Sequence, residues 1–191
     1  MKVLFYAGSG YECAALGNGL SFGKTSGKQL GRLAHREITE IYAKAAKHQV
    51  GRGGGHDKFL RMIVVYADII APLYWWKQFD TYKIGTVALS ESTMHTLLTA
   101  LLSQDNFEDP INPFTLLYLK WLKYRKDFTK LNNELPHSYL QRRIVCLNYE
   151  VINNILKNRS DHKLPQWRFF CDRARSVLPY PELLYKSEKS N

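Results

Sequence analysis

The segment from Tyr74 to Lys83, YWWKQFDTYK, places amide, ammonium and carboxylate groups among large aromatic side chains. It directly follows an apolar run that predicts a buried strand. Aromatic faces beside hydrogen-bonding groups at a strand end suit a planar, charged ligand such as a nucleotide. The alternative for each aromatic residue is packing, because Trp and Tyr are common half-buried residues with a polar tip.

A second group of polar residues lies in the C-terminal third of the chain. Pro136 is suited to the start of a helix, and the sequence after it predicts a helix from about Tyr139 to Asn158. Asn148 and Arg159 are eleven residues apart. At about 100° per residue, eleven residues of a helix return to within about 20° of the starting direction. We therefore expect their side chains to project from one stripe, with Asn154 facing elsewhere. For Arg159 the alternative is a solvated residue whose charge favours the end of a helix.

A strand from Leu60 to Ala71 is expected to position the aromatic segment. Its residues are rich in Val, Ile and Tyr, and apolar side chains occupy both sets of alternating positions, which indicates burial on both faces. Pro72 lacks an N–H group and biases Ala71 to extended geometry. We therefore expect the strand to end there and a new element to begin.

The region before this strand predicts one helix and two flexible segments. Apolar residues recur at three- and four-residue steps from Lys28 to Gln49, which indicates an amphipathic helix with His35 and Arg36 exposed. Before it we place only a short strand or helix at Val3 to Tyr6. The segment from Phe22 to Lys28 lacks the spacing of a phosphate-binding loop and is expected to be a flexible loop. Four glycines then form a hinge: Gly51, Gly53, Gly54 and Gly55.

The region after the aromatic segment predicts two further helices and a loop. Thr96 to Ser103 continues an apolar helix, and Gln104 to Pro113 is a loop rich in Asp, Asn and Pro. From Phe114 to Asn132, helical spacing links four apolar residues: Leu117, Trp121, Tyr124 and Phe128. The basic residues of this segment are expected to be solvated.

Composition indicates one folded domain spanning residues 1–191. The chain has 45% apolar and 13% aromatic residues, too many for disorder, and its core is complete alone or through oligomerisation. Apolar runs are shorter than the roughly 18 residues of a membrane span, so we expect a soluble, cytoplasmic protein with no membrane partner. Three scattered cysteines without CxxC spacing suggest neither disulfides nor a metal site.

The net charge of +10 favours an anionic partner. Nucleic acid is the default candidate, but the basic residues are scattered and form no motif for DNA or RNA binding. Phosphorylated small molecules would be served by the same excess of charge. We therefore expect a nucleotide ligand and consider nucleic acid an unlikely partner.

Two regions of the sequence resemble the flavin-dependent thymidylate synthases. In the first, His56 in a Gly-His pair precedes a strand that closes on Ala-Pro, an aromatic-X-Gln-aromatic segment around Gln78, and a Ser-rich loop with Ser90 and Ser92. The second region matches the family in the Pro-Asn, Asn-Asn and Asn-Arg intervals. Its matching residues are Leu135-Pro136, Tyr139, Asn148, Asn154, Arg159, His162 and Gln166-Trp167.

The resemblance implies an α+β fold in which long helices flank a central mixed or antiparallel sheet. It implies a homotetramer with flavin sites at its interfaces. In that family FAD carries hydride from NADPH, and methylene-tetrahydrofolate supplies the carbon that becomes the methyl group of dTMP. Such chemistry needs no protein nucleophile, because the cofactor does the carbon chemistry while the protein orients and polarises.

The resemblance also assigns roles by position. Arg159 would be the catalytic and nucleotide-binding residue, since a guanidinium has the donor fork for a phosphate or a uracil edge. Further substrate contacts would come from Gln78, Lys83, Ser90 and Ser92. Cofactor contacts would come from His56, Thr81, Tyr82, Lys83, Asn148, Asn154 and His162.

The sequence also departs from the family. Thr81-Tyr82-Lys83 stands where the family has Arg-His-Arg, and Met94-His95 replaces an Arg-Tyr pair. The leading hypothesis is a divergent member, of bacterial or phage origin, that transfers a one-carbon unit to dUMP or a related nucleotide. The alternatives are a non-catalytic or repurposed nucleotide-binding protein on the same scaffold, and a basic nucleic-acid-binding protein.

Overall fold

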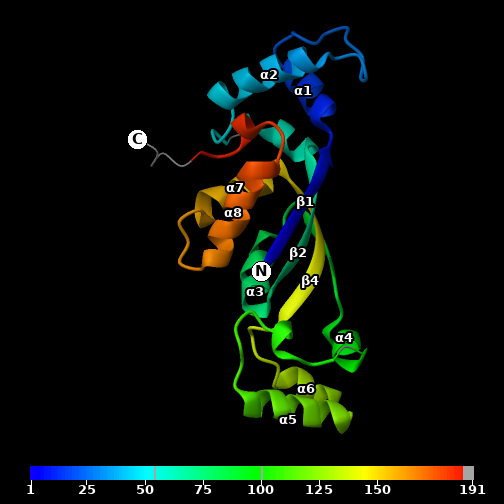
Figure 1. Ribbon diagram of the computed structural model, residues 1–191. Coiled ribbons are helices and arrows are strands. Elements are labelled where there is room, and N and C mark those ends of the chain that lie inside the picture. Colours follow the sequence, from blue (N-terminus) through cyan, green and yellow to red (C-terminus); the bar gives the residue numbers. More distant parts are fainter. Residues whose placement is uncertain (54, 100, 187–191) are drawn as a thin grey trace. The chain divides into compact units, whose positions relative to one another are not determined.

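The computed structural model describes residues 1–53, 55–99 and 101–186. Two residues of predicted elements lie outside the described ones: Gly54 of the glycine hinge and Ala100 of the helix expected from Thr96 to Ser103. Figure 1 labels β1, β2 and β4 of a four-stranded sheet whose strand order is β1-β2-β4-β3. Its strands are β1 (Lys2–Ser9), β2 (Val64–Pro72), β3 (Thr86–Ser90) and β4 (Leu140–Asn148).

The sheet is antiparallel throughout. The Leu73 amide donates to the Tyr139 carbonyl at 3.0 Å, and the Tyr149 amide donates to the Ile63 carbonyl at 3.1 Å, so the start of β2 meets the end of β4. Opposite directions of neighbouring strands also bring the Glu91 amide, after β3, within 2.9 Å of the Arg142 carbonyl in β4. The expected α+β class with an antiparallel central sheet is confirmed.

Eight α-helices and four short 3₁₀ helices accompany the sheet in the described part of the chain. The longest, α2, has 14 residues. The α-helices are α1 (Tyr11–Leu20), α2 (His35–His48), α3 (Leu73–Phe79), α4 (Thr93–Thr99), α5 (Pro113–Tyr124), α6 (Phe128–Asn133), α7 (Tyr149–Arg159) and α8 (Pro165–Val177). The 3₁₀ helices are η1 (Lys58–Met62), η2 (Asp80–Tyr82), η3 (Gln104–Asn106) and η4 (Pro181–Leu183).

Contacts between residues divide the chain into two units, and every strand has residues in both. Unit 1 consists of Met1–Leu4, Asp68–Thr81 and Ala88–Ile144. Unit 2 consists of Phe5–Ala67, Tyr82–Val87 and Val145–Asn191.

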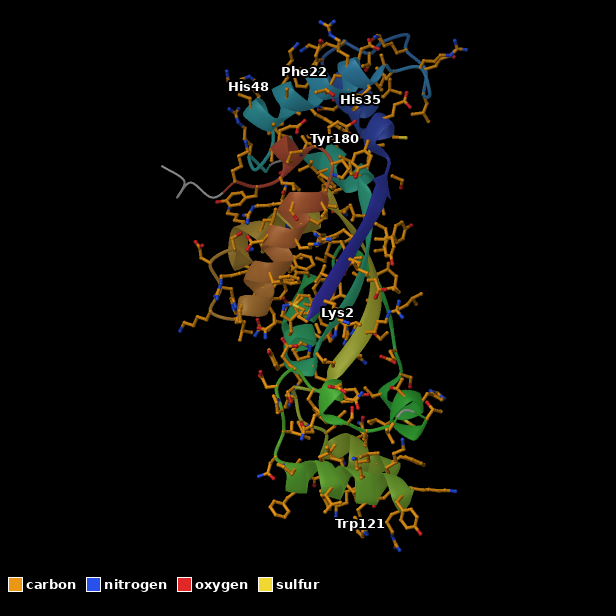
Figure 2. The ribbon with its side chains drawn as sticks, in the orientation of Figure 1. Lys2, Phe22, His35, His48, Trp121 and Tyr180 are labelled. Carbon is orange, nitrogen blue, oxygen red and sulfur yellow. The ribbon has the colours of Figure 1, made fainter. Side chains whose placement is uncertain are left out.

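Helix α5 of unit 1 has an apolar face directed to solvent. The residues at the predicted helical spacing, Leu117, Trp121 and Tyr124, are 65%, 52% and 84% exposed. Figure 2 shows Trp121 on the side of α5 that points away from α6. The segment is also two helices rather than one, because Lys126 between them adopts a positive φ of 57°.

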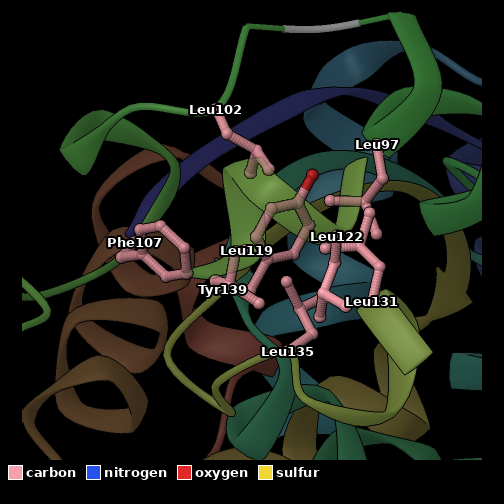
Figure 3. Close-up of a cluster of buried hydrophobic side chains, with 8 residues drawn as sticks. All are labelled: Leu97, Leu102, Phe107, Leu119, Leu122, Leu131, Leu135 and Tyr139. Carbon is pink, nitrogen blue, oxygen red and sulfur yellow. The ribbon is translucent and has the colours of Figure 1, made fainter. Parts of the chain in front are cut away.

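The other side of α5 closes the core of unit 1 (Figure 3). Leu119 and Leu122 of α5 pack with Leu131 of α6 in a buried cluster that includes Phe107 and Tyr139, whose rings meet edge to face at 5.8 Å. Helix α3 adds a second set of buried rings. Trp75, Trp76 and Phe79 are each at most 2% exposed and contact one another. Three of the aromatic residues expected to face a ligand are therefore core residues, whereas Tyr74 and Tyr82 are half-buried.

In unit 2, α7 packs beside α8, and α1 packs beside α2. Tyr42 of α2, which is fully buried, donates a hydrogen bond to the Tyr11 carbonyl of α1. The Tyr180 ring lies edge to face on the Tyr42 ring at 4.9 Å. These contacts fix α1, α2 and the segment that leads to η4 as one body.

The expected strand is shorter at its start, and its second face is only partly buried. Leu60 and Met62 belong to η1, and β2 begins at Val64. One set of alternating residues, Val65, Ala67, Ile69 and Ala71, is fully buried, whereas Tyr66 on the other face is 46% exposed. Burial on both faces was wrong, because sequence alternation cannot show which face a second layer covers. The end of the strand at Pro72 is confirmed.

The predicted helix from Tyr139 to Asn158 was also wrong in its first half. Residues Leu140–Asn148 form β4, and the helix begins only at Tyr149. Val145 and Leu147 are buried with Gln141 at a period of two, which is the signature of a strand. Asn148 is consequently the N-cap of α7 and not a member of a helical stripe with Arg159.

Several other predicted boundaries are corrected. Helix α2 begins at His35 and not at Lys28, and Leu30 is 58% exposed outside it. The N-terminal region holds a complete strand, β1, and helix α1, where we expected only a short element. Helix α4 covers Thr93–Thr99, earlier than the helix expected from Thr96. In the described part of the chain, every helix is too short or too polar to cross a lipid bilayer.

The ion pair between β2 and β4 generates a prediction on acid stability. Arg142 donates from Nε to Asp68 Oδ1 at 2.9 Å and from Nη2 to Oδ2 at 2.5 Å, and this bond lowers the pKa of Asp68 below its ordinary value of 3.8. Because the pKa of Asp68 is lower in the folded state, its ionised carboxylate raises the free energy of unfolding above pH 3.8. This contribution is lost as the pH falls through the pKa of the folded state. We expect Asp68→Asn to cost about 1 kcal/mol in urea unfolding at pH 7 and less at pH 3. An equal cost at both pH values would contradict this account.

Candidate functional site

Arg159, the last residue of α7, lies against two aromatic side chains of unit 2. Its Nε donates a 3.0 Å hydrogen bond to the Tyr82 hydroxyl. Its guanidinium carbon is 4.9 Å from the Trp167 ring centroid and 5.8 Å from that of Tyr82. The Tyr82 and Trp167 rings meet edge to face at 6.0 Å. The guanidinium is therefore held flat and oriented, because both stacking and the hydrogen bond restrict its plane.

Two helix termini produce this arrangement. At the start of α7, the Asn148 side chain accepts a 3.0 Å hydrogen bond from the Val151 amide, which caps the helix. Three turns later, Arg159 ends the helix. Pro165 stands at the first turn of α8, where its missing N–H costs nothing, and Trp167 follows within that turn. Trp167 is fully buried and so forms a fixed platform for Arg159.

His162 lies in the turn between α7 and α8, beside the same platform. Its ring is 6.4 Å from the Trp167 ring, and its Nδ1 accepts a 3.1 Å hydrogen bond from the Leu164 amide. Burial first, and then the positive charge of Arg159, lower the pKa of His162 below its ordinary value of 6.5. At neutral pH the ring is uncharged, with Nδ1 as acceptor and Nε2 carrying the proton.

A pocket of about 300 Å³ lies elsewhere along α7, where the helix faces the glycine-rich turns. Gly51 and Gly53 in its wall adopt φ values of 78° and 64°, which residues other than glycine rarely adopt. The space beside their Cα atoms is open. Asn154 and Lys157 line the opposite wall from α7. The pocket thus combines an accessible backbone, an amide and an ammonium group.

One ion pair closes a side of this pocket. Arg61 donates from Nε and Nη2 to both carboxylate oxygens of Glu150, at 2.6 and 2.8 Å. Both side chains line the pocket, so the charge of Arg61 is already balanced. Lys157 is the other cation in the lining, and within the described residues it forms no hydrogen bond or ion pair.

The structure brings seven of the expected site residues into unit 2. Arg159, Tyr82 and His162 gather around Trp167, and Asn154 lines the glycine pocket. His56 is exposed in the turn between Gly55 and Asp57, which both line that pocket. Lys83 is exposed next to Tyr82. Asn148 caps α7 and lies against Gly85, where an added Cβ would come within 2.9 Å of the Asn148 amide nitrogen.

The remaining four expected site residues belong to unit 1. Gln78 is half-buried in α3, and its carbonyl accepts a 2.7 Å hydrogen bond from the Thr81 hydroxyl. Ser90 is exposed at the end of β3. Ser92 is exposed before α4, with its hydroxyl 3.0 Å from His95 Nδ1. Three of the residues expected to contact substrate thus lie in unit 1, whereas Lys83 and Arg159 lie in unit 2.

Sequence reasoning missed Trp167, Gly85 and Lys157 as parts of the site. Trp167 had a signal, because it stands in the Gln-Trp pair downstream of Arg159, but nothing in the sequence shows that its ring carries the guanidinium. The approach of Gly85 to Asn148 depends on pairing between strands and has no local signature.

The cluster can bind and polarise an anionic or carbonyl-bearing ligand. Its cations are Arg159 and Arg168, both of which act on His162, and Arg168 donates to the His162 carbonyl at 2.6 Å. Burial raises the pKa of the neighbouring Cys171 thiol to about 11, so this thiol is not a nucleophile at neutral pH. Among the described residues, no group of three or more His, Cys, Asp or Glu side chains could hold a metal ion.

The fold is similar to solved structures of two nucleotide-modifying enzymes. Thymidylate synthase X from Helicobacter pylori, solved with FAD and dUMP, aligns over 95% of each chain with a TM-score of 0.70 and 15% identity. The UMP/dUMP methylase PolB from Streptomyces cacaoi, bound with 5-Br dUMP, aligns over 95% of this chain and 92% of its own, with a TM-score of 0.62 and 9% identity. No family model and no curated protein matches the sequence. These likenesses establish a shared fold.

The contact between Arg159 and Tyr82 generates a prediction on coupling. Arg159→Met removes the hydrogen bond and the charge, and Tyr82→Phe removes only the hydroxyl. We expect a double-mutant cycle of these two variants, measured by urea unfolding, to give a coupling energy of about 1 kcal/mol. Arg159→Met with Tyr66→Phe, a tyrosine 46% exposed on β2, is the matched control. Equal coupling in both cycles would argue against the contact.

The cationic surroundings of His162 generate a second prediction. NMR titration should place the pKa of His162 below 6.5, and Arg168→Gln should raise it because the positive charge of Arg168 disfavours the protonated ring. A lowered pKa means that the neutral ring stabilises the folded state above pH 6.5 and that this contribution falls as the pH drops below that value. Arg36→Gln, a change on the exposed face of α2, should leave the titration unchanged. If the pKa of His162 is the same in Arg168→Gln as in the wild type, the electrostatic explanation is refuted.

Proposed function

We propose that this chain is a nucleotide-methylating enzyme of the flavin-dependent thymidylate synthase kind, acting on dUMP or a related pyrimidine nucleotide. The observation that carries the proposal is the oriented guanidinium of Arg159 at the end of α7, on a fold shared with two enzymes solved with uridine nucleotides. Arg159 and Arg168 both act on His162, and these positive charges suit a phosphorylated substrate.

Arg159 is assigned as the residue that binds and polarises the nucleotide. Its Nε donates to Tyr82, and this bond restricts the plane of the guanidinium. A fixed donor fork stabilises charge that develops on a carbonyl or phosphate oxygen without reorganising during the reaction. Lys83 is assigned as a further substrate contact, and Gln78, Ser90 and Ser92 as contacts that a neighbouring copy of the chain would supply.

The residues at the glycine pocket fit part of FAD. The cavity of about 300 Å³ holds a portion of a dinucleotide, and Lys157 and Asn154 offer an ammonium and an amide to its phosphate and ribose groups. His56, Asn148 and His162 are assigned to the same cofactor, with Thr81, Tyr82 and Lys83 in the place of the Arg-His-Arg triplet. When bound, FAD would supply hydride chemistry that protein side chains lack.

The co-substrates and the assembly are part of the proposal. NADPH would supply the reducing equivalents and methylene-tetrahydrofolate the carbon unit. A homotetramer would allow groups of neighbouring copies to complete each site. The exposed apolar residues of β3, Val87 at 65% and Leu89 at 74%, offer a surface that a second copy would cover.

A second candidate function is nucleotide binding without chemistry on the same scaffold. One observation favours it. Of the three residues in the triplet position, only Lys83 is a cation, whereas Thr81 bonds the Gln78 carbonyl and Tyr82 bonds Arg159. Fewer cations weaken a pyrophosphate site.

Two binding measurements separate these functions. We expect the purified protein to take up FAD, seen as a flavin absorbance spectrum, and to bind dUMP in calorimetry. With methylene-tetrahydrofolate and NADPH it should release tritium from 5-tritiated dUMP. Binding of dUMP without uptake of FAD would favour the second candidate, and binding of neither would refute both.

The role of Arg159 is tested by a conservative change. Arg159→Lys keeps the charge but loses the planar fork, and we expect kcat/KM for dUMP to fall about 100-fold, or about 2.7 kcal/mol. Arg36→Lys, at a side chain 88% exposed on α2, is the matched control and should retain full activity. Unchanged kinetics in Arg159→Lys would assign this residue to a structural role at the helix end.

A further inference from the structure

A second cavity, of about 510 Å³, lies in unit 2 between α1, α2 and the segment that joins them. It shares no lining residue with the glycine pocket along α7. Its walls come from the end of α1, from the residues between Phe22 and Leu33, and from one face of α2. The volume is in the range of small-molecule sites, about 300–1,000 Å³.

The body of this cavity is apolar. Phe22 and Leu33 of the joining segment face Ile41 and Ala45 of α2. Figure 2 shows His48 at the end of α2, where it reaches the rim. Such walls favour an apolar or aromatic ligand body, because burial removes its surface from water.

One buried acceptor lies unused in the wall. Gln49 is 7% exposed, and among the described residues no donor lies within hydrogen-bonding distance of its Oε1. A buried acceptor without a partner is costly, and a donor that reaches it recovers that cost. Because Oε1 is itself shielded, the Gln49 side chain would turn toward the cavity to accept a hydrogen bond from an N–H or O–H group of a ligand.

The rim carries an excess of positive charge. Lys24 and Lys44 line it together with His48. Both acidic residues of the lining are in ion pairs: Glu37 pairs with Lys28, a further lining residue, and Glu40 pairs with Arg36 at 3.0 Å. An organic anion would be attracted to this rim.

The cavity is held open by bonds at both ends of the joining segment. Thr25 is 1% exposed, packs against Gly19 and donates to the Leu16 carbonyl at 2.8 Å. At the other end, the Leu33 amide donates to the Glu12 carboxylate at 2.9 Å. The segment expected to be a flexible loop is thus fastened to α1, and a ligand would enter a preformed site with little ordering cost.

From these features we propose that this cavity is a binding site for a small amphipathic organic anion. The ligand has an apolar or aromatic body, one N–H or O–H donor for Gln49 Oε1, and one negative charge for Lys24, Lys44 and His48 at the rim.

The probe 8-anilinonaphthalene-1-sulfonate carries these three features: aromatic rings, an anilino N–H and a sulfonate. We expect the folded protein to bind it with one saturable site per chain, seen as enhanced fluorescence. Gln49→Leu should weaken binding about fivefold while the fold stays at least as stable, because an unpaired acceptor is replaced by an apolar group. Lys44→Gln should weaken it about threefold, and its matched control Lys47→Gln, an exposed residue outside the lining, should not.

Ala45→Phe fills the cavity and should abolish saturable binding. Thermal unfolding followed by circular dichroism checks that Ala45→Phe is folded. If Ala45→Phe is unfolded, the loss of affinity in Gln49→Leu tests the proposal. The proposal is overturned if the probe fails to bind, if binding persists in folded Ala45→Phe, or if Gln49→Leu binds as wild type. It is also overturned if binding depends instead on Trp121 of α5, as shown by its loss in Trp121→Ala.

Discussion

The antiparallel pairing of β2 with β4 is the constraint on which the candidate site depends. Both strands pass into a helix without an intervening loop, β2 into α3 at Pro72 and β4 into α7 at Asn148. The main-chain bonds at the two strand ends, Leu73 to Tyr139 and Tyr149 to Ile63, fix the register at each transition. A shift by one residue would reverse which side chains face the core and would rotate each helix start with them.

Sequence patterns located the breaks in the chain better than they identified the elements. Pro72 marked a strand end because proline cannot extend a ladder, and this conclusion needs no tertiary information. Strand β4 was mistaken for a helix because Arg143 stands on its buried face and interrupts the apolar alternation. Its guanidinium lies 4.4 Å from the Trp76 ring and binds Asp80 at 2.8 Å, contacts that make a cation acceptable there but leave no trace in local sequence.

At the candidate site, the sequence likewise identified a residue but not its geometry. Arg159 could be singled out from the sequence, since spacing to neighbouring Asn residues resembles a known pattern. Its geometry could not, because the orientation comes from Tyr82 and Trp167, which lie 77 positions before it and in the next helix. The aromatic segment gave the opposite result: Trp75 and Trp76 suggested a ligand surface and are core residues of unit 1. Composition alone cannot tell a buried ring from a ligand-facing one.

The close approach of Gly85 to the cap of α7 bears on how this protein tolerates diversification. A side chain at Gly85, which has a φ of 81°, would be strained and would press on the Asn148 amide that starts the helix. Combinatorial libraries aimed at new substrate preferences would therefore lose folded members at this position before any altered specificity could be selected. Randomisation of the exposed His56 itself, unlike that of the adjacent Gly55 with its φ of 90°, carries no such penalty, which makes His56 the better place to begin.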